Sequence, residues 1–248
     1  MKTNKYQKRF YRDWVKSKDL VKTRICVRQT DLEILTDRPI DKKNLSRRLM
    51  LYRSDIENYI TRDEKFLTSL RPLSVEANAP LIVKEMARQA KIAGVGPMAA
   101  VAGAIAGFLG RDIFRMGCKD VIIENGGDIY LRATKPRYVN IYAGNSKLSG
   151  KIALKIEPQE TPLGVCTSSG SVGHSFSLGN ADSVVILARN VALADAVATA
   201  SANMVKSKED FKKAVIFASS IRNVRGVLII LGSSIIFWGR IRLSALKR

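Results

Sequence analysis

Strand-like segments of this chain follow one another in pairs, and this arrangement restricts the possible folds more than any other feature. Residues 23–37 alternate apolar and polar side chains on both sides of Gln29–Asp31, and residues 120–133 form two apolar runs joined by Gly126-Gly127. A third pair, joined by Gly232-Ser233-Ser234, lies near the C-terminus. Because paired strands without an intervening helix build antiparallel sheets, we predict an α+β fold.

Helical periodicity supplies the rest of the expected architecture. Apolar residues recur every three or four positions between residues 41 and 60, as on the buried side of a helix. Another helix is expected to begin at Asn78-Ala79-Pro80, because asparagine caps helices and proline is tolerated in a first turn, and to stop near Gly94. We also expect helices over residues 96–117, 190–206 and 209–219, strands over residues 138–144, 151–157 and 183–189, and one domain over residues 1–248.

The cysteines and apolar runs bear on where the protein works. Three cysteines stand far apart, without metal-type or disulfide-type spacing, and no secretory signal precedes them, so we expect reduced thiols and a cytoplasmic location. The longest apolar runs, Val95–Leu109 and Val227–Trp238, are shorter than the roughly 20 residues that a membrane-spanning helix needs. We therefore expect no membrane association.

The net charge of +20 is distributed unevenly along the chain. Residues 1–72 hold 19 Lys and Arg against 10 Asp and Glu, and residues 205–248 hold 10 against 2, whereas residues 73–204 hold 13 against 10. Basic flanks around a nearly balanced middle indicate a solvated surface with weak, non-specific attraction to polyanions. We therefore expect no nucleic-acid binding beyond this non-specific attraction.

The first segment that offers chemistry is residues 94–106, where Gly94 and Gly96 precede a helix. Unpaired amides at a helix N-terminus favour a phosphate or a carboxylate. An ordinary capped helix with closely packed small residues explains the same pattern, and from this segment alone that explanation is favoured.

The second segment is a turn, residues 124–129. Gly126 and Gly127 let the chain pass close to a ligand, and Asn125 and Asp128 add polar groups on either side. A hairpin turn with solvated acids explains this segment equally well.

Residues 164–182 are interpreted as an ordered loop that binds a phosphate or a heterocycle. They combine glycines, hydroxyls, one thiol and the single histidine, and the expected binding residues are Thr167, Ser168, Ser169 and Gly170. Within the same loop Cys166 and His174 are candidate catalytic residues, as nucleophile or sulfur carrier and base. A cysteine flanked by Val165 is also typical of a small buried apolar residue.

The fourth segment places a carboxylate and a hydroxyl on one side of a helix. Asp195 and Thr199 are four residues apart, so their side chains face the same way. Both are hard oxygen ligands of the kind that suits magnesium. An aspartate in a first helical turn and a threonine bonded to its own helix are the alternative explanation.

In combination these segments are far more specific than any one of them. Their order and spacing resemble the signature of an uncharacterised branch of the ApbE-like superfamily, which is related to the FAD:protein FMN transferases. The similarity covers nearly the whole chain and continues through residues 51–60, 66–73, 79–87 and 238–243. This resemblance implies a T-fold-related arrangement of layered antiparallel sheets with packed helices.

The resemblance also implies a ligand and the residues that bind it. The transferases bind FAD with magnesium and move its FMN half onto a protein threonine. Their flavin-binding motifs match Gly94, Gly96, Asn125, Gly126, Gly127, Asp128, Thr167 and Ser168 of this chain, and their metal-binding pair matches Asp195 and Thr199. The implied cofactors are FAD or FMN and magnesium, with the metal bridging to the pyrophosphate.

The chain departs from the transferase pattern in two segments. The transferases carry a lysine where this chain has residues 96–100, and a His-His-Ile-Asp-Pro stretch where this chain has residues 173–182.

Similar proteins of anaerobic microbes are linked to homocysteine formation, which would give Cys166 a role in sulfur metabolism. A non-enzymatic metabolite-binding module is the other alternative. Alanine-rich helices make a homo-oligomer, in the simplest case a homodimer, the expected state.

Overall fold

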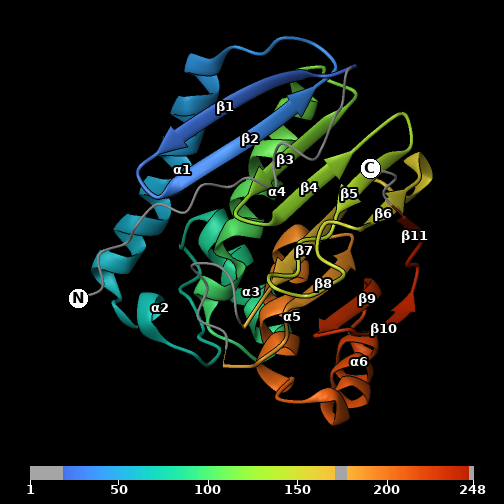
Figure 1. Cartoon of the computed structure of the whole chain (residues 1–248). Coiled ribbons are helices and arrows are strands. Elements are labelled where there is room, and N and C mark those ends of the chain that lie inside the picture. The colour runs from blue at the N-terminus through green and yellow to red at the C-terminus, as the bar shows by residue number, and fades with distance from the viewer. Residues whose placement is uncertain (1–18, 171–177, 246–248) are drawn as a thin grey trace.

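A computed structural model describes residues 19–170 and 178–245 and shows one large antiparallel sheet (Figure 1). Eight strands pair in the order β1-β2-β3-β4-β7-β8-β9-β10, each antiparallel to its neighbours. They are β1 (Val21–Val27), β2 (Thr30–Thr36), β3 (Val121–Asn125), β4 (Asp128–Arg132), β7 (Leu163–Ser168), β8 (Ser183–Ala188), β9 (Val224–Leu231) and β10 (Ser234–Gly239). All three strand pairs expected from the sequence are therefore hairpins of this sheet.

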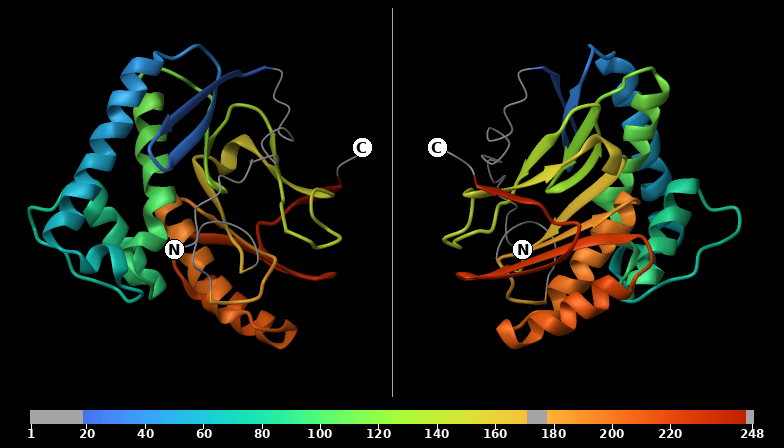
Figure 2. Two further views of the ribbon diagram at one scale, coloured as in Figure 1. Left: turned by 60° about the vertical axis from the view of Figure 1, so that its left-hand side comes forward. Right: turned by 90° about the vertical axis from the view of Figure 1, so that its right-hand side faces the viewer.

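The helices lie on one side of the large sheet, and a small sheet lies on the other (Figure 2). The small sheet has the order β11-β6-β5, with β5 (Arg137–Asn140), β6 (Ile152–Ile156) and β11 (Leu243–Ala245). The α-helices are α1 (Lys42–Arg62), α2 (Lys65–Thr68), α3 (Leu81–Ala93), α4 (Val101–Arg115), α5 (Val191–Met204) and α6 (Phe211–Ser220). This layering confirms the α+β prediction.

Two apolar cores hold the layers together. The larger core fills the space between the sheet and the helices, and the smaller one lies between the sheet and its three-stranded neighbour. Helix α5 is buried almost throughout, including its alanines at positions 192, 194, 196, 198, 200 and 202. The alanines of α5, from which a homo-oligomer was expected, thus pack within the chain itself.

The start of α1 and the end of α3 lie at capping residues at the positions expected from the sequence, whereas the start of α3 does not. Asp41 caps α1 by accepting a 2.8 Å hydrogen bond from the Lys43 amide, and Gly94 ends α3 in a left-handed conformation with φ of 73°. Asn78 is not a helix cap, contrary to the expectation. The chain turns just before the helix, where the Ala79 amide bonds to the Glu76 carbonyl, and Pro80 precedes α3 without a side-chain cap.

The segment expected to be a long loop begins as a strand. Residues Leu163–Ser168 form β7 in the middle of the sheet, between β4 and β8, so Cys166, Thr167 and Ser168 are strand residues. Glycine suits this strand because a Cβ at Gly164 would lie 2.7 Å from the Val191 Cα of α5. The glycine that predicted a loop thus marks close contact between a strand and a helix.

Most of the apolar run at Val95–Leu109 lies in a helical unit that continues beyond the run to Arg115. A 3-10 turn, η2 (Pro97–Ala100), continues directly into α4, and the combined 19 residues are long and apolar enough to cross a membrane by length and composition alone. About 61% of the apolar window is buried inside the protein. Packing of α4 against α5 and against β3 and β4 explains this apolar character.

Candidate functional site

The hairpin turn between β3 and β4 is the first component of the site. Gly126 and Gly127 both have positive φ, 68° and 105°, which is the requirement of a two-residue hairpin turn of the right twist. The Glu124 carboxylate accepts a 2.9 Å hydrogen bond from the Gly127 amide. Asn125 donates a 3.1 Å hydrogen bond from Nδ2 to the Ala102 carbonyl, which fixes the turn against the start of α4.

The start of α4 is the second component, and Asp195 of α5 is hydrogen-bonded to it. Its Oδ2 accepts a 2.8 Å hydrogen bond from the Gly103 amide, and the Ala102 amide also donates to this carboxylate. First-turn amides of a helix have no partner within their own helix, so a carboxylate there acts as a cap. Asp195 supplies this cap from 92 residues away in the sequence.

Gly103 lets the two helices approach closely enough for this contact. A Cβ at Gly103 would lie 2.5 Å from the Val191 carbonyl oxygen and 2.8 Å from the Asp195 Cβ. The glycine was within a segment expected to bind anions, but its partner helix could not be read from the sequence. Gly103 and Ala102 are thus site residues that sequence reasoning missed.

Asp128, the first residue of β4, brings a second carboxylate to the same place. It is only 7% exposed, and burial together with the nearby Asp195 carboxylate raises its pKa well above the usual range. The Cys166 thiol and the Thr167 amide donate hydrogen bonds that partly oppose this shift. Within the described part of the chain, Oδ1 of Asp128 has no hydrogen-bond partner.

Asp195 shares these surroundings. Its side chain is nine-tenths buried, and burial raises its pKa to about 7 despite the hydrogen bonds from the Gly103 and Ala102 amides. No Lys or Arg among the described residues forms an ion pair with Asp195 or Asp128. Two adjacent buried carboxylates without a cation are costly unless they bind a proton or a metal ion.

Cys166 lies next to this pair, on β7. The side chain is fully buried, with Sγ 3.4 Å from the Val191 carbonyl oxygen. Burial and the Asp128 and Asp195 carboxylates raise the pKa of the thiol well above its usual range. Since the thiolate is the reactive species, this position favours an inert thiol over a nucleophile.

Other expected site residues fall into two groups. Gly94 ends helix α3, and Gly96 lies against the Ser69 carbonyl, where a Cβ would approach to 1.7 Å. Both glycines therefore have backbone reasons for their identity. Gly170 lies at the exposed end of the segment after β7, packed against the Gly179 carbonyl.

The expected hydroxyl ligands lie along β7 and α5. Ser168 is buried, and its Oγ has no hydrogen-bond partner among residues 19–170 and 178–245. Thr167, Ser169 and Thr199 are half-buried. His174, the expected base, lies outside the described residues.

The donor set fits a metal that takes few protein ligands. Across the described ranges no group of three or more His, Cys, Asp and Glu side chains is arranged to hold a metal ion. That excludes a zinc-type cage there, whereas magnesium uses one or two carboxylates and completes its shell with water and phosphate oxygens. Asp128 and Asp195, with one carboxylate oxygen unpartnered, meet this requirement.

Comparisons of the sequence place these features in a family. The family model described as "AbpE bacteria" matches residues 12–223. A UPF0280 protein of Methanococcus aeolicus is 41% identical over 220 residues, which cover 86% of this chain and 88% of the relative. A UPF0280 protein of Methanocaldococcus jannaschii is 39% identical over 225 residues, 89% of this chain and 91% of the relative.

Comparisons of the structure agree. The flavin transferase ApbE of Vibrio cholerae superposes with a TM-score of 0.60 at 15% identity, over 91% of this chain and 96% of that protein. The apo form of the Pseudomonas stutzeri flavinyl transferase ApbE gives a TM-score of 0.60 at 14% identity, over 89% and 94%. At such low identity the likeness establishes a common fold.

Proposed function

The chain belongs to the family described as AbpE bacteria, and from this premise we propose that it binds a flavin or adenine nucleotide together with magnesium. The proposed site is the cluster formed by the β3–β4 turn, the start of α4, β7 and the first half of α5. FMN transfer is the phosphoryl-type reaction that such binding would serve, by analogy with the flavin transferases of the same fold.

One observation carries the proposal: Asp128 and Asp195 are buried near one another, and no Lys or Arg of the described residues forms an ion pair with either of them. Their shifted pKa values and the unpartnered Asp128 Oδ1 describe a site that is electrostatically incomplete. A divalent cation would offset the repulsion between the carboxylates and restore the missing contact. Ser168, whose hydroxyl is also unpartnered, is the adjacent donor available to a phosphate oxygen.

Magnesium would supply positive charge at the phosphorus under attack. In the proposal Asp128 and Asp195 hold the ion, and Thr199, one turn further along α5, adds a hydroxyl oxygen. The Gly126-Gly127 turn lies against Thr167 of β7, since a Cβ on Gly127 would be 3.7 Å from the Thr167 carbonyl oxygen.

Because this chain lacks the lysine of the transferases, magnesium would supply more of the positive charge that contacts the nucleotide. The first turn of the α4 unit contains proline, methionine and two alanines, so its contribution to an anion is limited to backbone groups. We therefore expect nucleotide affinity to depend strongly on magnesium.

Calorimetric titration with FAD, with and without magnesium, tests the proposal. We expect binding in the presence of magnesium and a loss of at least tenfold in affinity in EDTA. Asp195→Asn should remove the magnesium dependence, because an amide keeps the shape of the side chain and loses its charge.

Asp112→Asn is the matched control. Asp112 is another buried aspartate, near the opposite end of α4, where the Tyr52 hydroxyl donates a 2.5 Å hydrogen bond to it. Its substitution should affect stability and leave FAD binding unchanged. Absence of binding to FAD, FMN, ATP and ADP in every magnesium condition would exclude the proposed function, provided that circular dichroism shows a folded protein.

A further inference from the structure

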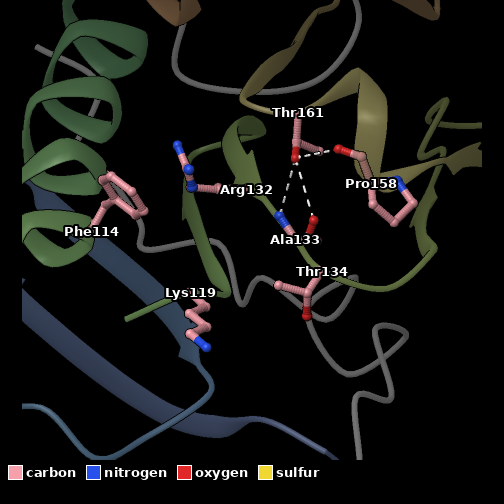
Figure 3. Close-up of a pocket in the computed structure, with 7 residues that line it drawn as sticks. All are labelled: Phe114, Lys119, Arg132, Ala133, Thr134, Pro158 and Thr161. Carbon is pink, nitrogen blue, oxygen red and sulfur yellow. Dashed lines mark hydrogen bonds between the residues drawn. The ribbon is translucent and has the colours of Figure 1, made fainter. Parts of the chain in front are cut away.

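A cavity open to solvent lies at the other end of β4 from Asp128. It encloses about 340 Å³ and is lined by Phe114, Lys119, Arg132, Ala133, Thr134, Pro158 and Thr161 (Figure 3). Asp128 begins β4 and Arg132 ends it, so the cavity is about 14 Å along the strand from the proposed nucleotide site. The cavity is therefore separate from that site.

Two cations of this cavity have no carboxylate partner among the described residues. Neither Lys119 nor Arg132 forms an ion pair within residues 19–170 and 178–245. Arg132 is held in place nonetheless, because its guanidinium lies 3.5 Å from the centre of the Phe114 ring. Figure 3 shows the Arg132 side chain turned toward Phe114, with Lys119 contributed by the neighbouring segment.

The nearby acids are already engaged by other groups. Asp120 accepts hydrogen bonds from Thr134 Oγ1 at 2.5 Å and from Arg137 at 2.9 Å. Asp37 accepts from the Lys119 and Asp120 amides at 2.9 and 3.2 Å. Asp120 forms an ion pair with Arg137 at 2.9 Å, and Asp37 lies 3.8 Å from Arg38, so within the described residues neither carboxylate is the ion-pair partner of Lys119 or Arg132.

The polar groups of the cavity wall are also largely satisfied. Thr161 donates from Oγ1 to the Pro158 carbonyl at 2.8 Å and lies 3.4 Å from the Ala133 amide (Figure 3). What the cavity offers a ligand is therefore positive charge from two side chains and apolar surface from Phe114 and Pro158. This combination suits an anion better than a neutral polar molecule.

We propose that this cavity binds a phosphate group, either free or carried by a small organic molecule. The guanidinium of Arg132, held by the Phe114 ring and by a hydrogen bond with Tyr130, contacts the phosphate oxygens. The Lys119 ammonium, which points away from Arg132 in Figure 3, adds positive charge at the edge of the cavity. Phe114, which is 39% exposed, gives an organic phosphate a ring to pack against. The site extends beyond the proposed function, since it needs neither magnesium nor Asp195.

Titration with inorganic phosphate and with phenyl phosphate, followed by NMR of backbone amides, tests this proposal and separates the two sources. EDTA is present throughout to keep the magnesium site out of the measurement, and potassium chloride of equal ionic strength is the reference. We expect saturable shifts at Lys119, Arg132 and Thr134. Tighter binding of phenyl phosphate would identify an organic phosphate as the ligand, and equal binding would identify the free ion.

Variants complete the test. Lys119→Met with Arg132→Gln should weaken binding about tenfold or more, since two charge-assisted contacts are lost. Lys119→Met alone, at an exposed position that does not affect folding, should weaken it about threefold. Lys135→Met is the matched control, because Lys135 is an exposed cation paired with Asp19 and does not line the cavity.

The results separate this cavity from the nucleotide site. Asp195→Asn should bind phosphate like the wild type, so failure of the proposed function would leave this result intact. Shifts that chloride reproduces, or a double variant that binds as well as the wild type, would overturn the proposal.

Discussion

Carboxylates that lie at the two ends of the β3–β4 hairpin are in opposite electrostatic states. At the turn, Asp128 and Asp195 lie together with no ion-pairing Lys or Arg in the described part of the chain, and their pKa values are raised. At the open end, Arg137 donates hydrogen bonds to Asp120 at 2.9 Å and to both carboxylate oxygens of Asp19 at 2.8 and 3.0 Å. The hydrogen bond from Arg137 lowers the pKa of Asp19 to about 2.

Burial alone does not explain this difference. Asp120 is as buried as Asp128, at 4% and 7% exposure, and burial opposes the ionisation of both. Hydrogen bonds from Thr134 and Arg137 outweigh burial at Asp120 and lower its pKa. The partner of each carboxylate therefore decides the direction of its pKa shift. Asp120 has a cationic partner in Arg137, whereas Asp128 and Asp195 have none among the described residues.

The largest expected effect is at the completed end. Arg137→Met should lower the free energy of unfolding by about 4 kcal/mol at pH 7, because it leaves the buried Asp120 without its cation. Urea denaturation measures this change. Lys135→Met, which removes only an exposed partner of Asp19, should cost less than about 0.5 kcal/mol. A similar small cost for Arg137→Met would mean that the network contributes little.

The next effect is a dependence of stability on pH at the incomplete end. The pKa of Asp195 is about 7 in the folded protein and about 4 in the unfolded chain, so the native state binds more protons. Its contribution is complete below pH 4 and is lost as the pH rises through 7. We expect Asp128→Asn to flatten this decline and to raise stability at pH 8 by about 2 kcal/mol, measured by urea denaturation in the absence of magnesium. A steeper decline in the variant would contradict this account.

Magnesium should reverse the same decline. At a concentration ten times its dissociation constant, it should stabilise the protein by about 1.4 kcal/mol at pH 8 and much less at pH 5, where the carboxylates hold protons. Thermal unfolding with magnesium or sodium at equal ionic strength measures the difference. The Asp128→Asn variant should show no such response, and an equal response in that variant would place the metal elsewhere.

The smallest effect should come from Cys166. We expect Cys166→Ser to cost about 1 kcal/mol or less and to leave FAD binding unchanged, since a hydroxyl can still donate to the Val191 carbonyl. Alkylation followed by mass spectrometry gives a direct check. Exposed Cys26 should react quickly, whereas Cys166 and buried Cys118 should react only on unfolding. Rapid modification of Cys166 in the native protein would support a catalytic thiol.

Local patterns were enough to predict most of the fold. The period of apolar residues in α1, the stop at Gly94 and the Gly126-Gly127 turn are properties of short segments, and each appears where the sequence indicated. Strand β7 was missed because Gly164, which accommodates Val191 of a distant helix, has the same local signature as a loop glycine.

The candidate site could be predicted only in outline. The four motifs named the segments that meet, but Asp195, which was expected to bind a metal, is found to cap α4 through Gly103. The Asp19–Arg137 pair joins residues 118 positions apart and left no signal at all. Such contacts depend on how layers pack, which a pattern along one segment does not specify.

The crowding around Val191 has a genetic consequence. Gly103 of α4 and Gly164 of β7 both meet its backbone, where an added Cβ would come within 2.5 and 2.7 Å. Every missense codon that replaces glycine introduces at least that one carbon. In a saturation mutagenesis library, we therefore expect these two codons to tolerate synonymous changes only, so that even alanine is lost. Neighbouring Gly107, where a Cβ would lie 3.5 Å from the nearest atom, should accept alanine.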